Sequence, residues 1–254
     1  MCLVWLFLTS WKAALATDPH AYHAVSKTVK NNCKFCAYAQ VLSHLLSKII
    51  YYTINMQDIV FDLGAVLIDW NQRHLYRKIF QNPVQMEQFL STVVPMSWNL
   101  EMDGGKPFAQ GCAERIKLFP QYADEINAYH TRWAEMMGGA IDGTVQILHE
   151  LKSKGHRIYA LSNWSAETFP LAQAKFPFLS ELDGAVISGF EKCVKPDPQI
   201  YQLLLSRYQL QAQNCIFTDD NPANIKSAKT LGFDTILFTS PADLRAALQA
   251  RGVL

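Results

Sequence analysis

Short apolar runs recur along the chain after residue 56, and they predict the strands of a sheet. Their near-continuous apolar character is typical of strands buried on both faces of a parallel sheet. The runs cover residues 58–62, 157–162, 184–188, 215–219 and 234–238. Apolar residues recur with helical spacing between them, over 145–154, 198–208 and 222–231. Strands that alternate with helices predict an α/β fold with an open, doubly wound parallel sheet.

Residues 72–143 break this alternation. They contain helix-period segments at 75–80, 84–94, 108–119 and 124–137, and no clear buried strand. We therefore predict a helical cap at 72–143, inserted into a core formed by 56–71 and 144–254. The insertion follows the carboxyl end of the first strand, which is the edge where open α/β sheets bind ligands.

Residues 1–55 differ from the rest of the chain. The apolar run at 2–8 has no basic residue before it and is too short for a membrane span, and His44 and Lys48 interrupt the apolar stretch at 41–54. Cys33 and Cys36 form a single CxxC with no recognisable second ligand pair, which favours ordinary thiols over a metal or redox site. We interpret 1–55 as an extension, or as an upstream stretch foreign to the mature protein, and we expect no membrane span.

Composition and charge narrow the range of partners. Of the 254 residues, 50% are hydrophobic and 18% charged, which indicates a globular protein. The 23 basic and 22 acidic residues nearly balance, so we expect no nucleic-acid partner. Residues 1–56 hold five lysines and one acid, which leaves the remainder mildly acidic. Cysteines 112, 193 and 215 follow no spacing pattern, and this favours a reducing, cytoplasmic location.

Chemically useful side chains stand at the ends of successive predicted strands. They are Asp62, the Ser162-Asn163 pair, Lys195 and the Asp219-Asp220 pair. Carboxylates grouped at one sheet edge suit Mg²⁺, while hydroxyl, amide and ammonium groups suit phosphoryl oxygens. Each residue alone has an ordinary explanation as a turn or cap residue. Their order on four strand ends favours a common site.

These motifs together resemble the haloacid dehalogenase superfamily, in the subfamily with a helical cap after the first motif. The resemblance runs from about residue 56 to 238 and rests on Phe61-Asp-Leu-Gly-Ala-Val-Leu67, Leu161-Ser-Asn-Trp-Ser165, Lys195-Pro-Asp-Pro-Gln-Ile-Tyr201 and Phe217-Thr-Asp-Asp-Asn-Pro-Ala-Asn-Ile225. The Asp-Leu-Gly-x-Val pattern is similar to a group of bacterial sugar-phosphate phosphatases.

The resemblance implies a Mg²⁺-dependent phosphatase for a small phosphorylated molecule. Asp62 would attack phosphorus and form an aspartyl-phosphate, with Lys195 as the second catalytic residue. Phosphoryl oxygens would be held by Ser162, Asn163 and Lys195. The metal ligands would be the carboxylate of Asp62, the carbonyl of Gly64, and the acidic pair Asp219 and Asp220, of which Asp220 is the more direct ligand.

One departure from the family pattern concerns proton transfer. Most phosphatases of this superfamily have a second Asp two residues after the nucleophile as general acid and base, and here that position is Gly64. Losing a proton donor can cost about 10² to 10⁴ in rate. Three explanations of this departure are open. The protein is a slower phosphatase that uses good leaving groups such as anomeric phosphates, another residue such as Asp69 or His74 supplies the proton, or the activity has been lost.

Two other classes of function stay open at this point. A 2-haloacid dehalogenase would use Asp62 without a metal, although such enzymes typically have an aromatic residue at the position of Gly64. The third possibility is a binding protein that has kept the hydrolase fold but lost its catalytic activity. Four tryptophans either line a cavity facing the cap or belong to the core, Trp70, Trp98, Trp133 and Trp164. We expect Asn221 and Asn224 to fix the acidic loop as caps.

Overall fold

The computed structural model describes residues 57–254, so the predicted extension at 1–55 and its CxxC lie outside the described residues. A five-stranded parallel sheet has the order β5-β4-β1-β6-β7. The strands are β1 (Asp58–Phe61), β4 (Ile158–Ser162), β5 (Gly184–Ile187), β6 (Cys215–Asp219) and β7 (Asp234–Leu237). All five predicted strands are confirmed, and so is the α/β class.

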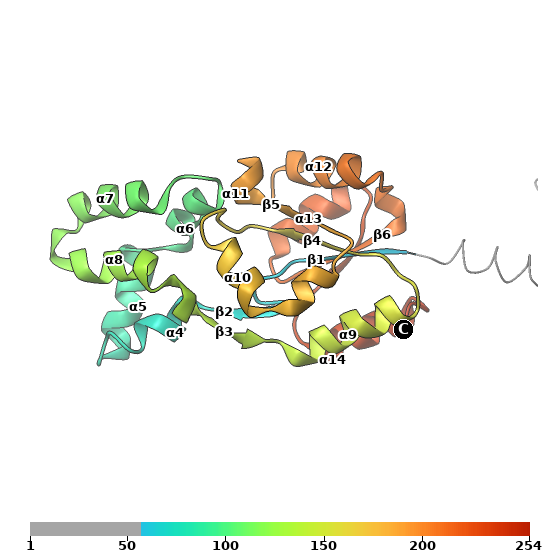
Figure 1. Ribbon diagram of the computed structural model, residues 1–254, viewed down its shortest axis with the longest axis horizontal. Helices are drawn as coiled ribbons and strands as arrows, with labels where there is room; N and C mark the ends of the chain where they lie inside the picture. The colour runs from blue at the N-terminus through green and yellow to red at the C-terminus, as the bar shows by residue number, and fades with distance from the viewer. Residues whose placement is uncertain (1–56) are drawn as a thin grey trace, which may run out of the picture. The chain divides into compact units, whose positions relative to one another are not determined.

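Helices cover both faces of this sheet (Figure 1). Side chains of β1 alternate between the two faces. Ile59 and Phe61 join a cluster that includes residues of α9 (Asp142–Ser153) and α14 (Pro241–Ala250), whereas Val60 packs with α12 (Pro198–Tyr208) and α13 (Pro222–Thr230). The three central strands β1, β4 and β6 are buried throughout and therefore have no solvated face, which explains their continuous apolar sequence.

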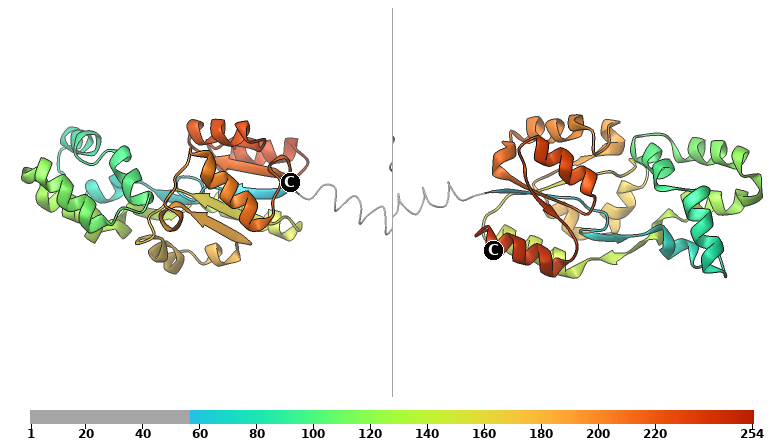
Figure 2. Two further views of the ribbon diagram at one scale, coloured as in Figure 1. Left: turned by 90° about the horizontal axis from the view of Figure 1, so that it is seen from above. Right: turned by 180° about the vertical axis from the view of Figure 1, so that it is seen from behind.

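A group of helices between β1 and β4 forms a separate layer at one end of this unit, seen in green at the left of Figure 1 and again in Figure 2. They are α4 (Gln72–Tyr76), α5 (Pro83–Thr92), α6 (Met96–Asp103), α7 (Phe108–Leu118), the 3-10 turn η1 (Pro120–Tyr122), α8 (Ala123–Thr131) and the 3-10 turn η2 (Trp133–Met136). Most of their buried apolar residues belong to the same cluster as the α9 and α14 face of the sheet. The insertion is thus anchored to the core by continuous apolar packing.

A two-stranded antiparallel ribbon connects the insertion to the core. It pairs β2 (Ile68–Trp70) with β3 (Met137–Ala140). The predicted helix at 124–137 is therefore too long, since α8 ends at Thr131 and β3 begins at Met137. This strand lies within the stretch where no clear buried strand is predicted, and only Met137 of its four residues is buried. The apolar spacing of Trp133 and Met136 continues that of α8 and imitates a longer helix, whereas β3 reads Met-Gly-Gly-Ala and has no apolar run. This strand forms because its backbone pairs with β2. The apolar periodicity of a single sequence cannot predict such a pairing.

Several short elements complete the unit. They are α10 (Phe169–Lys175), η3 (Pro177–Glu181), α11 (Ser188–Glu191) and η4 (Ala212–Asn214). Side-chain caps fix several helix starts, among them Asn221, whose side chain accepts a hydrogen bond from the Ala223 N–H at the start of α13. Across residues 57–254, none of the helices combines the length and apolar character that a membrane crossing needs.

Candidate active site

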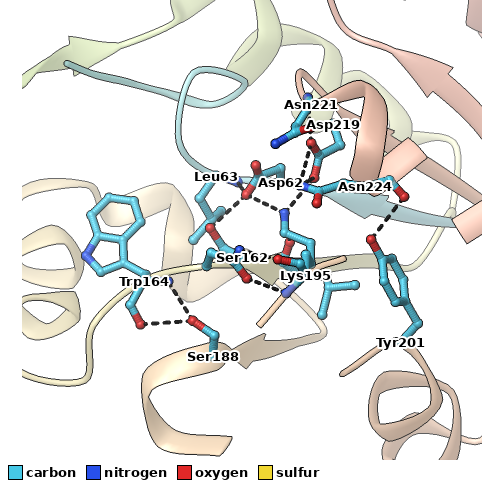
Figure 3. A network of polar contacts seen from close by, with 12 residues as sticks. Asp62, Leu63, Ser162, Trp164, Ser188, Lys195, Tyr201, Asp219, Asn221 and Asn224 are labelled. Carbon is cyan, nitrogen blue, oxygen red and sulfur yellow. Dashed lines mark hydrogen bonds and ion pairs between the residues drawn. The ribbon is translucent and has the colours of Figure 1, made fainter. Parts of the chain in front are cut away.

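The central strand places Asp62 between two neighbouring strand ends. Phe61 pairs with Ala160 on β4 and Thr218 on β6, so Asp62 lies where all three strands finish. The Asp62 N–H donates to the Thr218 carbonyl at 2.9 Å. Its Oδ1 atom accepts hydrogen bonds from the Leu63 N–H and the Ser162 hydroxyl, both at 2.7 Å (Figure 3). The carboxylate is therefore held in one orientation, and these contacts leave Oδ2 available to a ligand.

Lys195 places a buried positive charge between two carboxylates. Its side chain is only 1% exposed, and its Nζ lies 3.0 Å from Asp62 Oδ1 and 2.6 Å from Asp219 Oδ2. A third bond runs from Nζ to the carbonyl of Leu161 at 2.8 Å. Burial alone lowers the pKa of Lys195, but the charges of Asp62 and Asp219 outweigh it and raise the pKa. Lys195 is thus a permanent cation at the strand ends.

The acidic pair after β6 has one fixed and one open member. Asp219 is fully buried and accepts hydrogen bonds from the Asn221 N–H at 2.8 Å and from Asn224 Nδ2 at 3.0 Å. Asn224 thus fixes the acidic loop from inside α13, and the prediction that it acts as a cap is wrong. Asp220 is exposed at the cavity, but partial desolvation of its carboxyl group and the nearby charge of Asp219 raise its pKa.

The three carboxylates fit a divalent cation. Asp62, Asp219 and Asp220 each offer an oxygen, and these atoms lie within 4.8 Å of one another. Burial raises the pKa of Asp62 to about 7, helped by Asp219 and Asp220 and opposed by Lys195 and Ser162. One lysine cannot neutralise three carboxylates, and oxygen donors at this spacing are the ligands that Mg²⁺ prefers. The donor set therefore matches the predicted metal.

Asn163 is occupied in holding the Lys195 loop. Its Nδ2 donates to the Lys195 carbonyl at 2.9 Å, and its Oδ1 accepts from the Lys195 N–H at 2.8 Å. Both groups of the side-chain amide are used, although the residue lines the cavity. Direct binding of phosphoryl oxygens by Asn163 stays a prediction, whereas its clamp on Lys195 is a feature of the structure.

A cavity of about 700 Å³ opens over these residues. Asp62, Gly64, Ser162, Lys195 and Asp220 lie on its core side. Its other side comes from the helical insertion and includes Leu90, Met96, Asn99, Leu100, Asp103 and Trp133. The strand-end residues that the sequence singled out therefore meet in one cavity beneath the inserted helices, with Asp219 just behind its surface.

Three of the four candidate tryptophans line this cavity. Trp133 lies between Trp70 and Trp164, with ring centroids 6.3 Å and 5.4 Å away respectively. Trp98 instead packs edge-on against Tyr129 within the insertion. The cavity thus has one aromatic wall, whereas Trp98 is part of the hydrophobic interior of the insertion.

The two candidate substitute acids lie elsewhere. Asp69 Oδ2 and His74 Nε2 pair with each other at 2.9 Å, next to Gly138 on the ribbon, and neither residue lines the cavity. The hypothesis that one of them replaces the acid missing at Gly64 is wrong. Asp69 lies on β2, and its side chain lies beside Gly138 of β3. This placement depends on the β2–β3 ribbon, which the sequence pattern does not predict.

One buried acid in the cavity has almost no signal in the sequence. Asp103 is the last residue of α6 and is 9% exposed. Helix α6 has no side-chain cap at Pro95, and its apolar spacing is weak. The sequence pattern therefore does not identify Asp103 as a residue of the site. The only sequence signal is an Asp directly before Gly104-Gly105, where a helix is expected to end.

With this geometry, the chain can be placed in a family. Residues 56–232 match the family model of haloacid dehalogenase-like hydrolases, and the chain belongs to this family. Sesquiterpene phosphatase astK from Aspergillus oryzae is 24% identical over 179 residues, which cover 68% of this chain and 85% of that protein. Acyl-CoA dehydrogenase family member 10 from Mus musculus is 36% identical over 110 residues, 41% of this chain but only 10% of that protein.

Solved structures show the same fold. A family enzyme from Bacteroides thetaiotaomicron, crystallised with magnesium and inorganic phosphate, superposes with a TM-score of 0.56 at 22% identity. The superposition covers 73% of this chain and 95% of that one. The fold is therefore a parallel sheet of the haloacid dehalogenase type, as the sequence predicts.

Proposed function

We propose that this hydrolase is a Mg²⁺-dependent phosphatase that acts on a small phosphate monoester through an aspartyl-phosphate on Asp62. The observation that carries this proposal is the contact set of Asp62. Its carboxylate lies 3.0 Å from Lys195 Nζ and 2.7 Å from Ser162 Oγ, beside the acidic pair Asp219 and Asp220. A nucleophile, a fixed cation, a hydroxyl donor and a cation site thus share one cavity.

Each group has a role in phosphoryl transfer. The Asp62 carboxylate attacks phosphorus and expels the alcohol, and water then hydrolyses the acyl-phosphate. Both the nucleophile and the substrate are anions, so Lys195 offsets their repulsion while it and Ser162 donate to the phosphoryl oxygens. Asn163 keeps the Lys195 loop in place. The Asp62, Asp219 and Asp220 carboxylates and the Gly64 carbonyl would hold Mg²⁺, which supplies positive charge to the transferring phosphoryl group.

The relatives and the cavity support this interpretation. One relative is named a phosphatase, and one structural neighbour was crystallised with magnesium and phosphate. The cavity of about 700 Å³ has room for a metal, a phosphoryl group and a modest organic group. Its wall of Trp70, Trp133 and Trp164 suits the face of a ring, as in a sugar phosphate. A cytoplasmic location stays a prediction.

A phosphate-ester panel tests the proposal. Purified protein is assayed for phosphate release from p-nitrophenyl phosphate and sugar phosphates, with Mg²⁺ or with a chelator. We expect turnover only with Mg²⁺, and its loss in Asp62→Asn. Metal-independent chloride release from 2-chloropropionate would indicate the dehalogenase instead, and Mg²⁺ binding without turnover of any ester would indicate a binding protein.

A further inference from the structure

The cavity contains few groups that can supply a proton to a leaving alcohol. The carboxylic acids among its described lining residues are Asp62, Glu87, Asp103 and Asp220. Asp62 and Asp220 are assigned above to the nucleophile and the metal. Glu87 is exposed, and two hydrogen bonds of 2.7 and 2.6 Å from Arg73 lower its pKa, so it is ionised. No histidine lines the cavity within residues 57–254, which leaves Asp103.

Asp103 is oriented by a chain of buried hydrogen bonds inside the cap. Asn99 Nδ2 donates to Asp103 Oδ2 at 2.7 Å, and the Tyr129 hydroxyl donates to Asn99 Oδ1 at 2.7 Å. The Gln72 Nε2 in turn donates to the Tyr129 oxygen at 2.8 Å. Each donor in the chain is fixed by the next, so the carboxyl group is held in one position and does not rotate freely.

The main chain of Asp103 is tied directly to the core. Its carbonyl accepts a hydrogen bond from the buried Ser188 hydroxyl at 2.6 Å, and Ser188 Oγ accepts one from the Trp164 N–H at 2.9 Å. Trp164 follows the Ser162-Asn163 pair at the end of β4, and Figure 3 shows Ser188 and Trp164 next to Ser162. This tether holds the end of α6 over the strand edge that carries Asp62.

The surroundings favour the protonated form of Asp103. Burial raises its pKa to about 7, and the negative charge of Asp62 adds to this. The Ser165 N–H, Lys195 and Asn99 act in the opposite direction but are outweighed. A substantial share of the protein therefore has a neutral Asp103 near pH 7, and a general acid is most effective when its pKa is close to the working pH.

We propose that Asp103 is the catalytic acid and base of this hydrolase, supplied by the cap in place of the carboxylate missing at position 64. This inference rests on the proposed phosphatase function. In the first step the P–O bond breaks, its electron pair goes to the leaving oxygen, and the Asp103 proton moves to that oxygen as Asp62 bonds to phosphorus. In the second step the Asp103 carboxylate takes a proton from the water that attacks phosphorus. Phosphate and the Asp62 carboxylate are released, and Asp103 is protonated again.

The test compares two leaving groups in Asp103→Asn. p-Nitrophenolate leaves without a proton, whereas an alkyl alcohol such as that of hexyl phosphate needs one. Because kcat/KM reports the first step, we expect it to fall by about 10² to 10⁴ for hexyl phosphate and by less than about 10-fold for p-nitrophenyl phosphate. The retained activity on the second ester also shows that the variant is folded.

A rescue variant and a control sharpen this test. A Cβ at position 64 would meet nothing within 4 Å, and the backbone there is not left-handed, so Gly64→Asp is sterically allowed. Combined with Asp103→Asn, it should restore hexyl phosphate turnover by at least about 10-fold, since it returns a carboxyl group beside the nucleophile. Asp69→Asn, outside the cavity, should change neither ester.

The outcomes separate the two proposals. An equal loss on both esters in Asp103→Asn, or no loss on either, would overturn the role of Asp103 and leave the phosphatase intact. A wild-type protein that hydrolyses neither ester in the presence of Mg²⁺ would overturn the phosphatase itself. A selective loss on the alkyl ester together with rescue by Gly64→Asp would establish the role.

Discussion

The two walls of the cavity are built in different ways. The strand ends and their loops form one side, called here the core wall, and the inserted helices form the other, called here the cap wall. On the core wall, Asp62, Lys195 and Asp219 lie at the ends of neighbouring parallel strands or in a loop beside them, and short contacts hold them against one another. On the cap wall, Asp103 is the end of a chain that begins at Gln72 and passes through Tyr129. The core wall is a cluster of buried charges, whereas the buried part of the cap wall is a relay of neutral donors that ends at one acid.

This difference assigns separate tasks to the two walls. Charges of opposite sign in a buried cluster suit the binding of a metal and a phosphoryl dianion, which must be neutralised when water is excluded. A single acid with a raised pKa suits proton transfer, which needs a group that changes its charge. We therefore expect substitutions on the core wall to damage stability and binding together, and substitutions on the cap wall to act on proton-dependent behaviour.

The largest stability effect should come from Lys195→Met on the core wall. The substitution leaves the buried Asp219 and the largely buried Asp62 without their cation, which costs about 3–5 kcal/mol of the free energy of unfolding. Urea denaturation without metal measures it. Lys229→Met, at an exposed site on α13, is the control and should stay within about 0.5 kcal/mol. A loss below about 1 kcal/mol for Lys195→Met would contradict a charge-based core wall.

The cap wall should show itself through the pH dependence of stability. The pKa of Asp103 rises from 3.8 to about 7 on folding, so the folded state binds its proton more tightly than the unfolded state in this window. Stability contributed by that proton is present at low pH and is lost as the pH rises from about 4 to about 7, by about 1.4 kcal/mol per unit of pKa shift.

Asp103→Asn removes this titration and provides the measurement. Thermal unfolding of the wild type and the variant is compared at pH 5 and pH 8, both in a chelator so that no metal contributes. The variant should gain more stability relative to the wild type at pH 8 than at pH 5, because the wild type loses most of its proton-linked stability between these two pH values. An equal difference at the two pH values would show that Asp103 is ionised throughout and would weaken its assignment as an acid.

A smaller effect is expected from Tyr129→Phe in the middle of the relay. The substitution removes the hydroxyl between Gln72 and Asn99 and leaves two buried polar groups without that partner, at a cost of about 1–3 kcal/mol. Tyr122→Phe, whose partly buried ring packs on Phe89, is the matched control and should be nearly neutral. An equal free energy of unfolding for the two variants would show that the hydrogen bonds of the Tyr129 hydroxyl do not stabilise the fold.

The core wall could be predicted from the sequence because its residues follow apolar runs. A run such as 58–61 identifies a buried strand, and parallel strands end at one edge, so the apolar pattern alone places Asp62 and Asp219 together. The motif resemblance adds their order. The same logic locates Ser162 and Lys195 but does not reveal that Asn163 clamps the Lys195 loop.

The cap wall could not be predicted in this way. Its relay joins Gln72, Asn99 and Tyr129, which lie on three helices and share no motif. Helix α6 lacks a clear apolar stripe, and β3 has no apolar run, so local periodicity reveals neither element. The direction of Asp69, and therefore its absence from the cavity, depends on the pairing of β2 with β3. Tertiary contacts that no local pattern encodes determine which acid of the inserted helices lines the cavity together with Asp62.

The most direct test of the central claim is to trap the phosphorylated enzyme. Wild-type protein turning over p-nitrophenyl phosphate with Mg²⁺ is quenched in acid, digested and analysed by mass spectrometry, with Asp62→Asn treated in parallel. We predict that one phosphoryl group is attached to the peptide containing Asp62 in the wild type, and to no peptide in the variant. Continued phosphate release with no adduct, or an adduct on another residue, would contradict Asp62 as the nucleophile.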